Sequence, residues 1–426
     1  MVNELVHILK IISSVFVAFA FIYSLYSVII SLFGIYKKKS LNTVEPKNRF
    51  ALLVAAHNEE AVVGDIILSL NKLDYPKELY DIFVIADNCT DNTAKNARAK
   101  GAIVYERFTK GKRGKGFAME WMFNKVFKME KKYDTVAIFD ADNIASKDFL
   151  KQMNKKLSEG YKVVQGYLDS KNPTDTWITT CYSITFWQTN RMTQLARNNM
   201  GLSCQLGGTG LCIDVEILKK LGWGVSCLTE DLEFTCKLVS NGYKVGFAYD
   251  AVVYDEKPLT LGQSWSQRRR WMQGYADVSG RYFLKLLKKG IMERSLTAID
   301  CAIYTIQPVM YIIMGIVTFV GLMQGGINMY SYLSGATGIM GGGNINIFTI
   351  LTTVFAIFLY VYTPFLLNLD KKLNFKIILY YVVLMPVYTI TWFPIAVQGI
   401  LKKNDKEWSH TKHTRSVDID ELEKAN

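Results

Sequence analysis

Two aspartates, Asp140 and Asp142, lie on either side of Ala141, directly after a run of apolar residues. One or two carboxylates can hold a divalent cation, and such a cation neutralises the charge on a diphosphate leaving group. Aspartate is also common in the ordinary turns that follow strands, so a metal site and a simple turn both fit this spacing. The pair therefore needs support from other parts of the chain.

A second acidic group is Glu230-Asp231, which follows Thr229. A hydroxyl group that attacks an electrophile must lose its proton, and a positioned carboxylate such as Asp231 can take it. Taken alone, the segment fits a helix start equally well, with Thr229 as the cap and the two carboxylates in the first turn.

Residues 267–271 read Gln-Arg-Arg-Arg-Trp, so that Gln267, Arg270 and Trp271 keep a Q-x-x-R-W spacing. The planar guanidinium of Arg270 suits the oxyanions of a departing diphosphate. Trp271 offers an apolar face against which a sugar ring could stack. Both side chains could instead anchor a helix at a membrane surface, and the position shortly after Thr229-Glu230-Asp231 favours the chemical interpretation.

Alternating apolar and polar segments from residue 50 onward predict the elements that hold these side chains. The expected strands are Phe50–Ala56, Ile82–Ala86, Ala102–Tyr105 and Thr135–Phe139, and the expected helices begin at His57 and cover Asp91–Ala99 and Gly116–Phe127. Such alternation predicts a parallel sheet with helices on both faces, whose ligands bind beyond the carboxyl ends of the strands. Three polar clusters follow strands in this way: His57-Asn58-Glu59, Asp87-Asn88 and Asp140-Ala141-Asp142.

A glycine-containing loop at residues 111–116 carries Lys112, Arg113 and Lys115, and such a loop can reach phosphates, although a solvated loop is the ordinary interpretation.

Three long segments contain no charged residue: Ile11–Tyr36, Cys301–Leu369 and Ile377–Ile400. Each is long enough to cross a hydrocarbon core of roughly 30 Å at least once. Residues 37–39 are all lysine, which predicts a retained anchor with its carboxyl-terminal side in the cytoplasm. Whether the second segment holds two or three spans is open. The lysines of the C-terminal tail favour a cytosolic location for that tail.

The net charge of +12 fits lysine and arginine near anionic lipid headgroups, and no nucleic-acid recognition module is visible. The seven cysteines are irregularly spaced, which favours reduced thiols in the cytosol. Two stretches, Cys181–Arg197 and Gln263–Lys289, mix aromatic and basic residues as helices at a membrane interface do.

In this order the motifs resemble those of the processive family 2 glycosyltransferases, the group of the cellulose, chitin, hyaluronan and poly-N-acetylglucosamine synthases. The resemblance implies an α/β fold of the GT-A (Rossmann-like) type, as a cytoplasmic glycosyltransferase domain inserted between transmembrane helices. It divides the chain into an N-terminal transmembrane helix (1–40), a GT-A domain (48–260), interface helices with the Q-x-x-R-W motif (261–296), C-terminal transmembrane helices (297–401) and a cytoplasmic tail (402–426).

The resemblance also implies roles for the residues that match. The general base is Asp231, with Glu230 and Arg270 beside it in the catalytic group. The expected ligands of Mg²⁺ or Mn²⁺ are Asp140 and Asp142. The expected nucleotide-sugar site consists of His57, Asn58, Glu59, Asp87, Lys115, Asp140, Gln267, Arg270 and Trp271. The acceptor site contains Gly208, Thr209 and Trp271.

Two parts of the chain depart from the family pattern. The usual double aspartate of the second strand is Ala86-Asp87, and the segment from Trp408 to Arg415 matches only loosely the one that can close over nucleotide.

The implied function is a processive, inverting transferase that polymerises a β-linked polysaccharide from a UDP-sugar and moves it across the plasma membrane. UDP-glucose, giving a cellulose-like or mixed-linkage β-glucan, is the preferred donor. A poly-N-acetylglucosamine or chitin-like synthase and a non-processive lipid-linked sugar transferase are the alternatives. The expected partners are the UDP-sugar, the growing polysaccharide and the lipid bilayer, with accessory or export subunits also possible and no nucleic acid.

Overall fold

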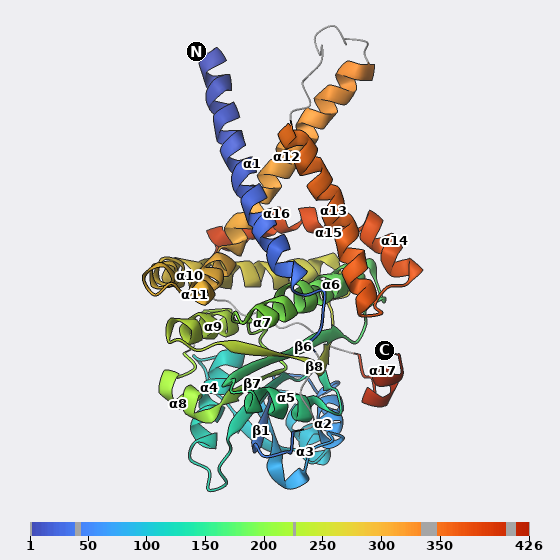
Figure 1. The fold of residues 1–426 in the computed structure, drawn as a ribbon. Helices are drawn as coiled ribbons and strands as arrows, with labels where there is room; N and C mark the ends of the chain where they lie inside the picture. The colour runs from blue at the N-terminus through green and yellow to red at the C-terminus, as the bar shows by residue number, and fades with distance from the viewer. Residues whose placement is uncertain (1, 39–43, 225–226, 334–346, 406–414, 426) are drawn as a thin grey trace.

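The computed structural model describes residues 2–38, 44–224, 227–333, 347–405 and 415–425. Figure 1 shows an α/β domain from which long apolar helices extend in one direction. The domain is built on one eight-stranded sheet with the order β3-β2-β1-β4-β7-β6-β8-β5. Its strands are β1 (Phe50–Ala56), β2 (Tyr80–Asp87), β3 (Ile103–Arg107), β4 (Thr135–Asp140), β5 (Ile144–Ala145), β6 (Val163–Ser170), β7 (Leu211–Asp214) and β8 (Val245–Asp255).

The expected parallel arrangement is present among β1, β2, β3 and β4, but it is wrong for the sheet as a whole. Strand β7 runs antiparallel to both of its neighbours, β4 and β6. Because β7 begins at the edge where β4 ends, the loop that precedes it, residues 207–210, lies beside Asp140. The mixed sheet thus adds a loop to the carboxyl edge that the alternation of strands and helices did not predict.

Helices cover both faces of the sheet. Within β1, Ala51 and Leu53 belong to one hydrophobic core with helix α4 (Lys115–Val126), while Phe50, Leu52 and Val54 belong to a second core with helix α2 (Val63–Asn71). A strand that is buried on both faces is apolar at nearly every position, as in this run. The helices and short turns of the domain are α2 (Val63–Asn71), η1 (Lys77–Leu79), α3 (Thr93–Ala99), α4 (Lys115–Val126), α5 (Phe149–Ser158), α6 (Trp177–Gln188), the π-helical η2 (Thr189–Leu195), α7 (Ala196–Met200), α8 (Val215–Leu221) and α9 (Glu230–Ser240).

The helix expected from His57 begins later, at Val63. Asn58 adopts a left-handed backbone conformation with φ +55°, which a right-handed helix does not allow. Its side-chain oxygen accepts a hydrogen bond from the backbone N–H of Thr90 at 2.8 Å. The segment therefore forms a turn against the loop that follows β2.

The remaining helices lie at the other end of the molecule. Helix α10 (Leu261–Met292) crosses between the sheet domain and the apolar helices (Figure 1). The set consists of α1 (Val2–Leu32), α10 (Leu261–Met292), α11 (Leu296–Thr305), α12 (Gln307–Leu333), α13 (Ile347–Leu369), α14 (Phe375–Val383), α15 (Met385–Ile390) and α16 (Trp392–Leu401).

Among the described residues one helix, with its apolar stretch at Ser14–Leu32, is long and apolar enough to cross a membrane. Two pairs of helices, Leu296–Thr305 with Gln307–Gly321 and Phe375–Val383 with Met385–Leu401, also pass if each is taken as one bent span, which gives up to three. The number of spans is therefore still open. The sequence Gly341-Gly342-Gly343 predicts a turn between spans, and these three residues lie outside the described residues.

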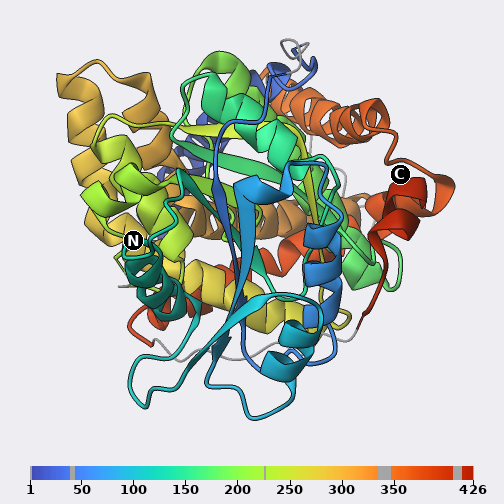
Figure 2. The same ribbon diagram turned by 90° about the horizontal axis from the view of Figure 1, so that it is seen from below.

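The last helix, α17 (Ile419–Ala425), returns to the sheet domain, and Figure 2 shows it beside α2. Ile419 packs in a hydrophobic cluster with Ile144 and Tyr254. Lys72 Nζ lies 2.8 Å from carboxylate oxygens of both Asp418 and Asp420. These contacts place the described end of the tail on the same side of any membrane as the sheet domain.

Candidate active site

The carboxyl end of β4 brings Asp140 into contact with two other segments. The ammonium group of Lys115, at the start of α4, forms an ion pair with Asp140 and donates a hydrogen bond to the carbonyl oxygen of Gly208 at 2.8 Å. The backbone N–H of Asp140 donates to the hydroxyl oxygen of Thr209 at 3.1 Å. Lys115, Asp140, Gly208 and Thr209, all expected at the site, therefore lie together.

Asp142 is buried and faces the loop after β8. One of its carboxylate oxygens accepts a hydrogen bond from the backbone N–H of Glu256 at 3.1 Å. Asp255 is nearby: burial, together with the charges of Asp142 and Asp140, raises its pKa to about 6 against the opposing charge of Lys257. Lys257 forms an ion pair with Asp255 at 2.5 Å. This concentration of carboxylates favours a cation.

Sequence reasoning did not identify Asp255 or Lys257, although their position at the end of a strand was an available signal. No group of three or more histidine, cysteine, aspartate or glutamate side chains in the described part of the chain has the arrangement of a metal site. Mg²⁺ usually needs only one or two protein carboxylates, because substrate phosphates and water complete its shell. Asp140 and Asp142 fit that pattern.

Asp87 lies at the carboxyl end of β2, and its carboxylate forms a buried ion pair with Arg107, the last residue of β3. His57 Nδ1 is 2.6 Å from the backbone oxygen of Asp87, so these two expected residues of the nucleotide site are neighbours. The backbone N–H of Glu59 donates a hydrogen bond to Oγ1 of Thr93, the first residue of α3, at 2.8 Å. Arg107 is a further member of this group that sequence reasoning missed.

Glu230 and Asp231 begin α9, as the interpretation as a helix start predicted. Thr229 occupies the cap position, but its side chain makes no capping hydrogen bond. It contacts α10 instead: a Cβ atom added to Gly274 would lie 2.3 Å from Thr229 Oγ1. Only glycine allows α9 and α10 to approach this closely.

The same helix start also meets the loop before β7. A Cβ atom added to Gly208 would lie 3.4 Å from Asp231 Oδ2, and Gly208 has a left-handed φ of +81°. Asp231 therefore faces the loop that the family resemblance assigned to the acceptor.

The carboxyl groups of Glu230 and Asp231 share one electrostatic environment. Burial and then the charge of Asp231 raise the pKa of Glu230 to about 7. Burial also raises the pKa of Asp231, whereas the backbone N–H of Leu232 and the charges of Lys115 and Arg270 lower it. Lys115 and Arg270, expected at the diphosphate, are thus close enough to act on the expected base.

The three expected residues of the Q-x-x-R-W motif lie on α10. Gln267 Oε1 accepts a hydrogen bond from the hydroxyl of Tyr182 at 2.7 Å. The ring of Trp271, which is half-buried, lies 5.9 Å from that of Tyr182 and 6.3 Å from that of Phe186. Trp271 therefore belongs to an aromatic group that reaches from the sheet domain to α10.

Arg268, inside the same motif, has a different position. It is completely buried, its guanidinium stacks on Tyr388 and Trp392, and Nη1 donates to Thr391 Oγ1 at 2.9 Å. Arg268 thus connects α10 to the break between α15 and α16. The sequence did not predict this structural role.

The described part of the C-terminal tail contacts residues next to the candidate active site. The segment from Trp408 to Thr414, which loosely matched a closing segment, lies outside the described residues. Arg415 is described: its backbone N–H donates to Glu256 Oε2 at 3.0 Å, and its side chain forms an ion pair with Asp175. Since Glu256 also binds Asp142, the docked tail borders the candidate metal pair.

Residues 46–274 match the family model described as "Glycosyltransferase like family 2". The chain belongs to this family of glycosyltransferases. Its α/β domain has the GT-A-type fold, as predicted. A solved structure of similar fold is the mannosyltransferase PcManGT from Pyrobaculum calidifontis in complex with GDP-Man and Mn²⁺, with a TM-score of 0.61 and 17% identity over 94% of this chain and 100% of that one.

Similar sequences include enzymes with different products. The probable glycosyltransferase YdaM of Bacillus subtilis is 28% identical, over 57% of this chain and 60% of its own length. A beta-monoglucosyldiacylglycerol synthase of Synechocystis is 28% identical, over 54% and 48%. A poly-beta-1,6-N-acetyl-D-glucosamine synthase of Staphylococcus aureus is 25% identical, over 60% and 61%. The chain thus matches about half to three fifths of the length of these relatives.

Proposed function

We propose that the protein transfers a hexose from a UDP-sugar to an acceptor hydroxyl at a membrane surface, in one displacement that converts an α-linked donor into a β-linked product. The observation that carries this proposal is the meeting of three segments at one edge of the sheet. Asp140 contacts Lys115, Asp231 faces Gly208, and Thr229 packs on Gly274 of α10. These contacts support a site in which a donor, a base and an acceptor lie within reach of one another.

In this proposal the donor is held by its nucleotide and its diphosphate. His57 and Asp87 bind the uridine, while Lys115 and Arg270 place positive charge at the diphosphate. Asp140 and Asp142 would hold Mg²⁺ or Mn²⁺, which supplies further neutralisation of the leaving group when bound. Asp231 accepts the proton of the acceptor hydroxyl as that oxygen attacks the anomeric carbon, and UDP departs.

The acceptor is proposed to be the end of a growing polysaccharide, with UDP-glucose as the donor. An aromatic side chain such as Trp271 can hold a sugar ring by stacking, without fixing its hydroxyl groups. The apolar helices next to α10 would give the product a path across a plasma membrane in which the enzyme is multi-pass and its catalytic domain is cytoplasmic.

A glycolipid product is the second candidate. The relative named beta-monoglucosyldiacylglycerol synthase matches 54% of the chain, and α10 lies between the sheet domain and the apolar helices. In this version a lipid hydroxyl, presented at the membrane surface, takes the place of the polysaccharide end.

The experiment tests a panel of UDP-sugar donors with and without an added lipid acceptor. Purified protein in detergent is incubated with UDP-glucose or UDP-N-acetylglucosamine, with Mg²⁺ or Mn²⁺, and with or without diacylglycerol. UDP release identifies the donor, and gel filtration separates long polymer from a glycolipid. We expect polymer from UDP-glucose without added lipid. Release that depends on diacylglycerol and yields only a glycolipid would replace the polymer proposal, and no release from any donor would overturn both.

A further inference from the structure

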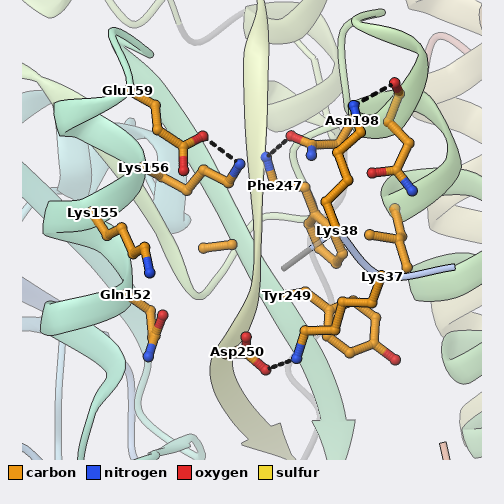
Figure 3. Close-up of a pocket in the computed structure, with 13 residues that line it drawn as sticks. Lys37, Lys38, Gln152, Lys155, Lys156, Glu159, Asn198, Phe247, Tyr249 and Asp250 are labelled. Atoms are coloured by element: carbon orange, nitrogen blue, oxygen red, sulfur yellow. Dashed lines mark hydrogen bonds and ion pairs between the residues drawn. The ribbon is translucent and has the colours of Figure 1, made fainter. Parts of the chain in front are cut away.

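A pocket of about 240 Å³ lies where the end of α1 meets the sheet domain (Figure 3). Its walls come from the residues that follow α1, the last turns of α5, part of α7 and the first half of β8. The pocket is remote from the candidate active site along β8, because its last strand residue, Asp250, precedes Asp255 by five positions. An irregularity of β8 between Ala248 and Val252 also separates the two sites.

The pocket is positively charged. Four lysines line it, Lys37, Lys38, Lys155 and Lys156, together with the carboxylates of Glu159 and Asp250. Lys37 forms an ion pair with Asp250, and Lys156 Nζ lies 2.7 Å from Glu159. Four lysines against two carboxylates leave a net of two positive charges around one small space. Figure 3 shows Lys155 and Lys156 on the α5 side and Lys37 on the other.

The position of the pocket relates it to the end of the apolar helix. Lys37 follows Leu32, the last residue of the apolar stretch of α1, by five positions. Between them Phe33, Ile35 and Tyr36 are 39%, 37% and 50% exposed. Exposed aromatic and aliphatic side chains followed by lysines are typical of the boundary between a bilayer and the cytoplasm, where basic residues face anionic headgroups.

We propose that this pocket binds a phosphate group, supplied by an anionic lipid headgroup or by a soluble phosphate. An ammonium group carries three donors and binds phosphate as a point charge, and the charge of a phosphate balances the excess of the four lysines. The volume is below the roughly 300–1,000 Å³ of pockets for drug-sized ligands, so it suits a headgroup better than a whole nucleotide sugar. Bound phosphate would join the segment after α1 to α5 and fix the catalytic domain relative to the membrane.

The site does not depend on the proposed reaction; only a lipid source rests on the proposed membrane placement. The test uses the full chain in nonionic detergent. One arm measures binding of short-chain phosphatidylglycerol, with short-chain phosphatidylcholine as the neutral comparison. The other arm titrates inorganic phosphate and follows thermal unfolding.

The variant carries Lys155→Gln and Lys156→Gln. Since one lysine near an anionic surface contributes about a fivefold factor in affinity, the pair should weaken binding by about thirtyfold. Lys151→Gln is the matched control, because Lys151 lies on the same helix but pairs with Asp74 and does not line the pocket. The double Lys→Arg variant keeps the charge and should retain binding.

The outcomes separate the sources. Binding of phosphatidylglycerol but not of inorganic phosphate, lost in the Gln variant, identifies a headgroup site. Binding of inorganic phosphate with the same loss identifies a soluble ligand. Equal binding by the wild type, the Gln variant and the Lys151→Gln control, or no binding in either arm, overturns the proposal. UDP release in neutral detergent should be unchanged in the Gln variant, which separates this result from a failure of the proposed function.

Discussion

Replacing Gly274 with alanine tests whether the approach of α10 to α9 sets the geometry of catalysis. The added Cβ would lie 2.3 Å from Thr229 Oγ1 and 2.5 Å from its Cγ2, so the two helices must separate by about 1 Å to reach the ordinary contact distance of 3.4 Å. A misplacement of about 1 Å can lower turnover by roughly 10²-fold. Overpacking costs about 1–3 kcal/mol, but alanine in a helix gains about 1 kcal/mol over glycine, so the net loss of stability should be about 0–2 kcal/mol.

The assay is UDP release by folded protein, with thermal unfolding measured on the same preparation. Gly280, on the same helix, provides the matched control Gly280→Ala, because an added Cβ there meets no atom within 4 Å. It should raise stability slightly and leave turnover unchanged. Adding Thr229→Ala to Gly274→Ala removes the two closest atoms and leaves the Cβ of residue 229 at 2.8 Å, so part of the activity should return. Wild-type turnover in Gly274→Ala would refute the argument.

Three further predictions concern the chemistry. Because Asp231 must be unprotonated to act as a base and burial raises its pKa, kcat/KM should fall as the pH drops through the raised pKa of this carboxyl. Glu230→Gln removes the group with a pKa of about 7 but not the base, so this acid limb should persist; a limb that disappears from the pH–rate profile of Glu230→Gln would assign it to Glu230 instead. Asp142→Asn should weaken Mg²⁺-dependent UDP binding by at least roughly tenfold, and a titration that gives equal affinity with and without Mg²⁺ in both proteins would leave the pair as a turn. Trp271→Ala should remain folded, because the ring is only half-buried, and should still release UDP while long polymer disappears; a strongly destabilised protein, with a loss near the 3–5 kcal/mol of a core tryptophan, would indicate a packing role.

The sequence predicted the α/β domain and the family well, because apolar runs that alternate with polar segments reflect a sheet buried on both faces. It also predicted that Asp87 and Asp140 lie at one edge of the sheet, since both come at the carboxyl ends of parallel strands. The arrival of Gly208 at this edge was suggested only by the family resemblance. Its physical cause is the antiparallel course of β7, which local periodicity does not encode.

Other members of the site could not be predicted because their roles arise from pairing across elements. Arg107 is one charged residue at a strand end until the register of β2 with β3 places it beside Asp87. Nothing in the run of three arginines indicates that Arg268 is the buried one. The turn at Asn58 was mistaken for a helix because its left-handed backbone is imposed by a contact with the loop at Thr90.

The two faces of α10 explain why the Q-x-x-R-W motif lies on a helix next to the apolar segments. Gly274 and Arg270, one turn apart, face the start of α9, where Asp231 lies. Arg268 and Met272, also one turn apart, face the opposite way: Arg268 binds Thr391, and a Cβ added to Gly399 would lie 2.4 Å from Met272 Cβ. Helix α10 is therefore closely packed on both sides. A shift of α16 would move α10 and, through it, the start of α9 at Asp231. In the proposed function, the position of the apolar helices in a bilayer therefore becomes a determinant of catalytic geometry.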